Sequence, residues 1–125
     1  MTVEQDVHDR LTCVSNLLTS GQQLDGVRIR CCAELLRTAV ERAVMLTCGS
    51  EQPIHALLLS LPTRVDADLA GDTAQLWHAL ARATRHHDYE VTPTPDELRG
   101  WHADVTSVTA ALLSAFTLTG TIDMS

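Results

Sequence analysis

Basic and imidazole side chains gather in one short stretch of this chain, between residues 82 and 89. Arg82, Arg85, His86 and His87 fall within six positions of a sequence that is otherwise acidic. An imidazole can act as a general acid or base near neutral pH, and a guanidinium can stabilise the charge that gathers on phosphate oxygens. These residue types suit cleavage of a phosphodiester. The alternative is a solvent-exposed helix end, whose partial negative charge favours cations, and on residue types alone we favour this alternative.

Histidines also raise the question of a bound metal. His86, His87 and His102 flank one predicted loop, and with Asp88 they offer ligands of the kind that zinc accepts. The sequence has neither an HxxxH pattern nor a cysteine-rich ligand spacing, and its four cysteines form no CxxC pair. We therefore predict no metal and no cofactor. A small-molecule or metal-binding protein that uses these three histidines is a third hypothesis, after the two functions given below.

The composition fits a single helical domain covering residues 1–125. A length of 125 residues is usual for one domain. Hydrophobic residues make up 45% of the chain, but only one Phe, one Tyr and two Trp are present. The core must therefore consist mainly of Leu, Val and Ala, which favours helices packed on helices over a β-sandwich.

The charge and the apolar pattern limit the partners and the location. The net charge is −7, and all nine basic residues are arginine. An acidic surface binds nucleic acid poorly unless it carries a local basic site. The sequence has no run of about eighteen apolar residues that could span a membrane. Residues 1–10 lack a signal-peptide pattern, so we predict a cytoplasmic protein with no membrane association, whose cysteines remain thiols.

Apolar residues recur at helical spacing in five segments. The predicted helices cover residues 3–19, 26–48, 54–61, 73–87 and 95–118. The strongest start signal precedes the last helix, where Thr94 is an N-cap, Pro95 occupies the first helical position and Glu97 completes a capping box. Asp25 and Asp72 are the predicted caps of the second and fourth helices, and residues 63–71 are predicted as a loop or an extra helical turn. We expect an all-α, antiparallel four- or five-helix bundle with the second, fourth and fifth helices at its core.

The order of these elements resembles the HEPN superfamily of small helical bundles, in particular its short stand-alone actinobacterial members. The resemblance covers residues 5–118. Its features are the long second helix with residues 33–44, the short Pro-opened helix with His55, the helix that ends in Arg, His and Tyr89, the loop with residues 92–95 and the long final helix. It implies a bundle that often forms homodimers. Many members are metal-independent RNases of toxin–antitoxin and defence systems, and others are binding or assembly modules without catalysis.

The resemblance also implies roles for the residues between 82 and 89. The family RNases use an Arg followed by four to six residues and then a His, and Arg82 and His87 match this spacing. Arg82 would bind or polarise the phosphate, and His87, or alternatively His86, would be the acid/base group. The candidate binding residues beside them are Arg85, Tyr89 and His102. Residues five apart on a helix lie about 140° apart, so Arg82 shares a face with His86 and meets His87 only if the helix unwinds before it.

Two functions follow from these observations. We predict a HEPN-like, non-catalytic homodimeric interaction or regulatory protein linked to RNA-targeting defence or toxin–antitoxin systems. The acidic charge favours this function, and so does Ala83, because the family motif commonly has a polar residue after the Arg. The alternative is a metal-independent endoribonuclease that acts through Arg82 and His87, and the partner would accordingly be a protein or RNA. The homodimer is also expected because residues 3–19 and the outer side of residues 95–118 carry more apolar surface than a monomer needs.

Overall fold

Five α-helices and one short 3-10 helix make up the part of the chain that the computed structural model describes, which is residues 2–20, 26–84 and 93–123, with side chains up to residue 116. The elements are α1 (Val3–Thr19), α2 (Gly26–Cys48), α3 (Ile54–Ser60), the 3-10 helix η1 (Leu61–Thr63), α4 (Ala67–Thr84) and α5 (Pro95–Asp123). No strand occurs in these residues. The predicted all-α helical bundle is therefore confirmed.

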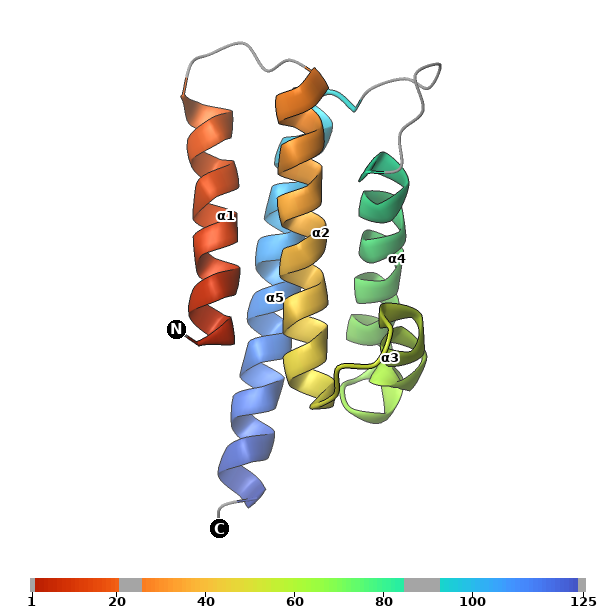
Figure 1. Ribbon diagram of the computed structural model, residues 1–125. Helices are drawn as coiled ribbons and strands as arrows, with labels where there is room; N and C mark the ends of the chain where they lie inside the picture. The colour runs from red at the N-terminus through yellow and green to blue at the C-terminus, as the bar shows by residue number, and fades with distance from the viewer. Residues whose placement is uncertain (1, 21–25, 85–92, 124–125) are drawn as a thin grey trace.

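The long helices run alternately up and down (Figure 1). α1 and α4 point in one direction, and α2 and α5 point in the other. α2 lies between α1 and α4 and contacts both of them, as well as α3 and α5. Successive long helices are thus antiparallel, as the sequence predicted, whereas α2 and α5 are neighbours that run parallel. α2 is the central helix of the bundle, and α1 and α4 lie on opposite sides of it.

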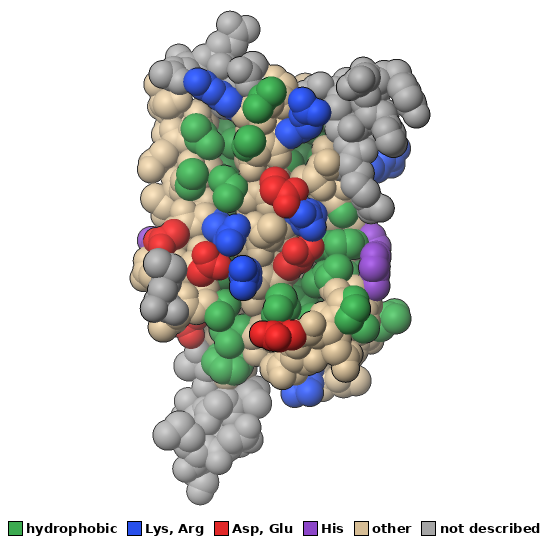
Figure 2. Space-filling model, viewed as in Figure 1, with side chains coloured by type: hydrophobic (Ala, Val, Ile, Leu, Met, Phe, Trp, Pro, Cys, Tyr) green, Lys and Arg blue, Asp and Glu red, His purple; other side chains and the backbone are tan. Residues whose placement is uncertain are grey.

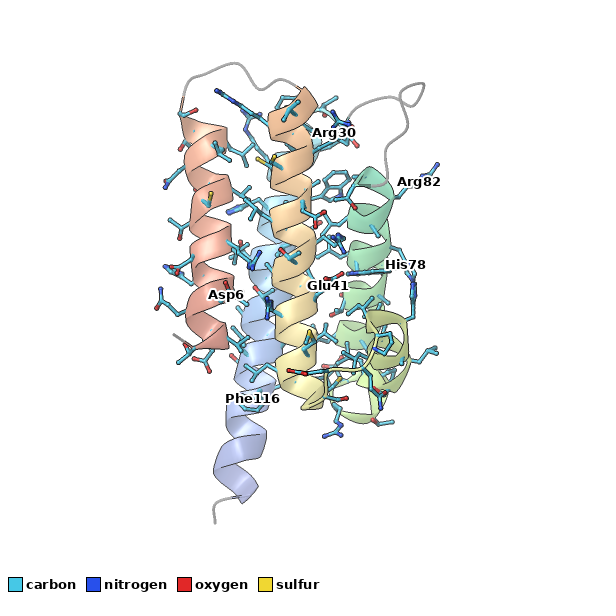
Figure 3. The ribbon with its side chains drawn as sticks, viewed as in Figure 1. Asp6, Arg30, Glu41, His78, Arg82 and Phe116 are labelled. Atoms are coloured by element: carbon cyan, nitrogen blue, oxygen red, sulfur yellow. The ribbon has the colours of Figure 1, made fainter. Side chains whose placement is uncertain are left out.

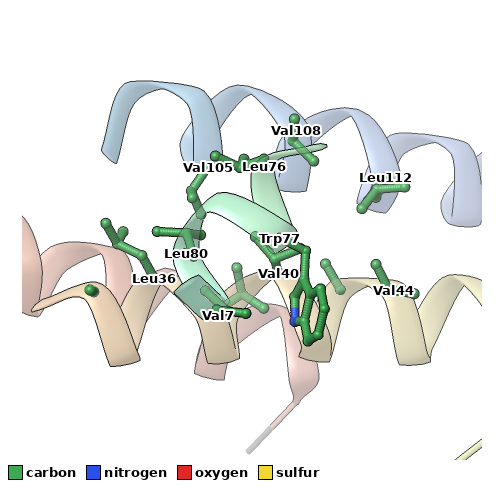
Figure 4. Close-up of a cluster of buried hydrophobic side chains, with 14 of the residues drawn as sticks. Val7, Leu36, Val40, Val44, Leu76, Trp77, Leu80, Val105, Val108 and Leu112 are labelled. Carbon is green, nitrogen blue, oxygen red and sulfur yellow. The ribbon is translucent and has the colours of Figure 1, made fainter. Parts of the chain in front are cut away.

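Aliphatic side chains form the core, as the scarcity of aromatic residues predicted. The buried residues of α2 follow helical spacing and are Ile29, Cys32, Ala33, Leu36, Ala39, Val40, Ala43, Val44 and Cys48. Leu80 of α4 and Val105 and Leu112 of α5 are fully buried in the same cluster (Figure 4). Burial of one such leucine side chain stabilises the fold by about 1.5–3 kcal/mol. The apolar stripes of α2, α4 and α5 thus hold the bundle together, and Val7 and Val14 attach α1 to it.

α4 begins earlier than the sequence predicted. The carboxylate Oδ1 of Asp66 accepts a hydrogen bond from the backbone N–H of Leu69 at 2.8 Å, so Asp66 is the N-cap and Asp72 is not. Residues 63–71, predicted as a loop or an extra helical turn, contain the end of η1 and the first turns of α4, so the helical alternative is correct for most of this segment. Leu69 and Ala70 pack on the core there. The exposed aspartates and Gly71 gave this segment a loop-like composition, although its inner face continues the apolar stripe of α4.

The other helix ends agree with the prediction in part. Glu97 N–H donates to Thr94 Oγ1 at 3.1 Å and Thr94 N–H donates to Glu97 Oε1 at 3.3 Å, so the predicted capping box is confirmed. Gly49 ends α2 with a φ of 65°, in the left-handed region that favours glycine. α5 continues to Asp123 rather than ending at residue 118. The predicted Asp25 cap and the predicted extension of the fourth helix over residues 85–87 lie outside the described residues.

No helix in the described part of the chain is long and apolar enough to cross a membrane.

Candidate functional site

Arg82 is the member of the predicted Arg–His motif that lies within the described residues. It occupies the last turn of α4. Its side chain is exposed and points away from α2 into the solvent (Figure 3). The structure does not describe Arg85, His86, His87 and Tyr89. That they form one site with Arg82 therefore stays a prediction.

His102 is held at a different place in the bundle. Its ring lies near the start of α5 and is half-buried, with Nε2 3.0 Å from the carbonyl oxygen of Leu11 in α1. A carbonyl oxygen can only accept a hydrogen bond, so this contact requires the proton on Nε2. α1 and α4 lie on opposite sides of α2 (Figure 1). The structure therefore joins His102 to α1 and does not bring it to Arg82.

A cleft between α2, α3 and α4 borders the predicted motif. Its volume is about 360 Å³, and the side chains that matter to its chemistry are Glu34, Arg37, Glu41, His55, Trp77 and Thr84. We call it the α2–α4 cleft. Thr84 ends α4 two residues after Arg82, so the cleft reaches the stretch of residues 82–89 that the sequence singled out.

Three charged residues of α2 form one wall of the α2–α4 cleft. They lie three and four residues apart, which places them on one face of the helix. Arg37 Nη1 donates to Glu41 Oε2 at 2.7 Å, and Arg37 Nη2 donates to Glu34 Oε1. The Nε of Arg37 is buried and has no partner within the described residues. Two carboxylates therefore share one guanidinium, and this wall carries a net negative charge.

Glu41 also joins α2 to α4. The indole Nε1–H of Trp77 donates to Glu41 Oε2 at 2.8 Å, so this oxygen accepts from both Trp77 and Arg37. Trp77 is 4% exposed, and a buried indole N–H needs an acceptor. Glu41 supplies that acceptor, and its role here is structural as well as electrostatic.

Two imidazoles flank Trp77 at the rim of the cleft. The ring centroids of His55 and Trp77 are 5.0 Å apart, and those of Trp77 and His78 are 5.1 Å apart, both pairs in edge-to-face geometry. The centroids of His55 and His78 are 6.1 Å apart. Both histidines are exposed, and Figure 2 shows histidine side chains at one edge of this face.

The α2–α4 cleft brings together residues that the sequence analysis did not connect. The spacing of Glu34, Arg37 and Glu41 predicts ion pairs along α2, and both pairs are present; Figure 2 shows acidic and basic side chains interleaved on this face. The contact between Glu41 and Trp77 joins residues 36 positions apart. The sequence pattern of neither helix alone predicts the contact between Glu41 and Trp77. His78 directly follows Trp77, which lies on the buried face of α4. This adjacency is the sequence feature that places its ring near the indole.

The cysteines lie away from this cleft and behave as thiols. Cys13 and Cys31 are exposed, whereas Cys32 and Cys48 are buried. Burial raises the pKa of the Cys32 thiol above its ordinary value of 9.0, and the neighbouring Cys13 and Cys31 raise it further. Cys32 is therefore protonated near neutral pH and packs as a small hydrophobic residue.

Within the described residues, no three His, Cys, Asp or Glu side chains lie close enough together to hold a metal ion.

Comparisons of this chain with known protein families, with curated proteins and with solved structures found no match. The function proposed below therefore rests on the resemblance in the order of elements and on the geometry of the described residues.

Proposed function

We propose that this chain is a HEPN-like, homodimeric interaction or regulatory protein without catalytic activity, linked to RNA-targeting defence or toxin–antitoxin systems. The observation that carries the proposal is the neutralised guanidinium in the α2–α4 cleft. Arg37 is already bound by two carboxylates. A phosphate in this cleft would meet a net negative wall instead of a cation.

The arrangement of the other described groups agrees with a non-catalytic role. RNA cleavage without metal needs a proton-transfer group and a cation that face the same phosphate. The imidazoles of His55 and His78 lie next to Trp77, and His55 lines the same cleft as the carboxylate wall, whereas Arg82 points outward from α4. The net charge of −7 disfavours the approach of RNA as a whole.

The proposed homodimer is supported by the last turns of α5. They extend beyond the ends of α1 and α2 (Figure 1), and Phe116, which lies where α5 leaves the bundle (Figure 3), is 37% exposed. A helix segment without a packing partner is only marginally stable in water. A second copy that packs against α5 would supply that partner. α1 contributes less to this argument than expected, because Leu11, Leu17 and Leu18 pack on the core.

We further propose a cytoplasmic location. The four cysteines of the chain carry free thiols in the structure, which suits a reducing compartment.

The test of this proposal is RNA integrity at high protein concentration. Single-stranded and structured RNAs incubated with purified protein in EDTA should remain intact for hours. Cleavage that co-purifies with the protein through successive columns would contradict the proposal.

The second candidate function is a metal-independent endoribonuclease that uses Arg82 with His87 or His86. One observation favours it: Arg82 is exposed on the last turn of α4, one turn beyond His78 on the same helix, where a phosphate in solution can reach it. This function predicts RNA cleavage that is lost in Arg82→Ala and in His87→Ala. Activity that survives both substitutions would remove these residues from the mechanism.

A further inference from the structure

A groove runs along the seam between α4 and α5, apart from the α2–α4 cleft. Two hollows of about 460 Å³ and about 450 Å³ adjoin at Asp72, which lines both. The first also contains Trp101 and Asp104 of α5. The second also contains Asp66 and Asp68 of α4. We call the two hollows together the α4–α5 groove.

Small side chains along the seam leave this groove open. Ala79 of α4 and Ser107 of α5 line the first hollow, and Ala111 of α5 lines the second. Leu76 and Val108, which belong to the core cluster in Figure 4, also line the first hollow and are 8% and 9% exposed. The groove therefore has apolar surface at its base.

The rim of the α4–α5 groove is acidic. It carries Asp66, Asp68, Asp72 and Asp104, and no arginine lines either hollow among the described residues. None of these four carboxylates belongs to an ion pair within the described part of the chain. Asp68 and Asp72 lie four residues apart on α4, a spacing at which like charges destabilise a helix. This contrasts with α2, where Arg37 is paired with both Glu34 and Glu41.

We propose that the α4–α5 groove binds a basic amphipathic helix of a partner protein. The proposal deepens the proposed interaction function and rests on it. Apolar side chains of the partner would contact Leu76, Trp101 and Val108, and its Arg or Lys residues would pair with Asp72 and Asp104. The α4 residues from Asp68 to Ala79 span about 16 Å, which accommodates three turns of a bound helix.

A second copy of the chain is a poor occupant of this groove. The rim of the groove carries four aspartates and no arginine among the described residues, so an occupant must bring basic side chains to it. Several arginines of the chain are also already paired with its own carboxylates, namely Arg10, Arg37, Arg42 and Arg99. Charge complementarity therefore points to a different, basic chain.

The test uses a synthetic peptide of about fifteen residues with leucines on one helical face, arginines on the flanks and no tryptophan. It is added to the full-length ¹⁵N-labelled protein, whose two tryptophans give two indole N–H signals in NMR spectra. The signal of Trp101, which lines the groove, should shift on titration, while that of Trp77, buried beside Glu41, should stay in place. A peptide of the same composition without an amphipathic pattern is the control.

Substitutions then locate the site. Asp72→Asn with Asp104→Asn should weaken peptide binding about tenfold. Glu4→Gln with Glu51→Gln changes the net charge equally at exposed positions outside the groove and should leave the affinity unchanged. Ala79→Trp should block binding without any change in charge, because its ring would fill the first hollow. Circular dichroism checks that each variant is folded.

Three results would overturn the proposal. They are a Trp101 signal that does not respond to the peptide, an affinity that falls equally in both double variants, and a response of Trp101 to an RNA oligonucleotide in place of the peptide. RNA cleavage by the protein without any peptide would instead contradict the non-catalytic function proposed above. The two proposals can therefore fail independently.

Discussion

At the scale of single residues, Glu41 is the side chain on which the α2–α4 cleft depends most. One of its carboxylate oxygens accepts hydrogen bonds from both Arg37 and Trp77. Its side chain is 22% exposed, so these bonds are largely shielded from water. Its two partners are also poorly exposed: Trp77 is 4% exposed, and the Arg37 side chain is 24% exposed and keeps Glu34 as a second partner through Nη2. Loss of the carboxylate would therefore leave an indole N–H and a guanidinium N–H without partners.

We expect Glu41→Ala to lower the free energy of unfolding by about 2 kcal/mol, because two shielded donors lose their acceptor. Glu34→Ala is the matched control. Glu34 pairs with the same arginine but is 48% exposed, so its loss should change the stability by less than about 1 kcal/mol. Urea denaturation followed by circular dichroism measures both. Equal effects of the two substitutions would show that the bond to Trp77 contributes nothing.

At the scale of elements, the start of α4 separates a sequence-based expectation from the structure. The predicted cap at Asp72 implied a helix that begins at residue 73, whereas Asp66 caps a helix that begins at Ala67. We therefore expect Asp66→Ala to destabilise the protein by about 1 kcal/mol through loss of the N-cap. Asp72→Ala, in an exposed interior position of α4, should be neutral or slightly stabilising, because it removes a like-charge neighbour of Asp68. Thermal unfolding measures the stability of both variants. If Asp72 were the cap, Asp72→Ala would be the more destabilising of the two substitutions.

Local patterns predicted most of the helices and little of the site. The apolar stripe of α2, its glycine terminator and the capping box at Thr94 are encoded within a few residues each, so periodicity and capping rules locate them. The α2–α4 cleft depends on where Trp77 of α4 meets Glu41 of α2. That contact is set by tertiary packing and not by local spacing. The same reason explains why His102, close in sequence to the motif, is bonded to α1 instead.

At the scale of the whole molecule, the protruding end of α5 predicts self-association. Light scattering should give twice the mass of the 125-residue chain at micromolar concentration. Phe116→Arg should shift the protein toward the monomer, because it places a charge where α5 leaves the bundle. Leu59→Ser is the matched control, since Leu59 is 83% exposed on α3 and away from that end. A wild-type monomer, or a dimer unaffected by Phe116→Arg, would contradict this interface.

The carboxylates of the molecule differ in whether they are paired with arginines. The carboxylates near α2 are paired with arginines, whereas those along the α4–α5 groove are not, within the described residues. The four aspartates of the groove are therefore available to a basic partner. This distribution suits a protein that recognises another protein and repels RNA over most of its surface.

The central claim is that the chain does not cleave RNA, and a rate measurement with a fluorescent RNA reporter tests it most directly. Wild-type protein in excess over the reporter, in EDTA, is compared with Arg82→Ala, His86→Ala and His87→Ala purified in parallel. We predict that all four proteins give the rate of the buffer alone. A wild-type rate well above the buffer rate that disappears in Arg82→Ala and in either histidine variant would contradict the claim and establish the endoribonuclease instead.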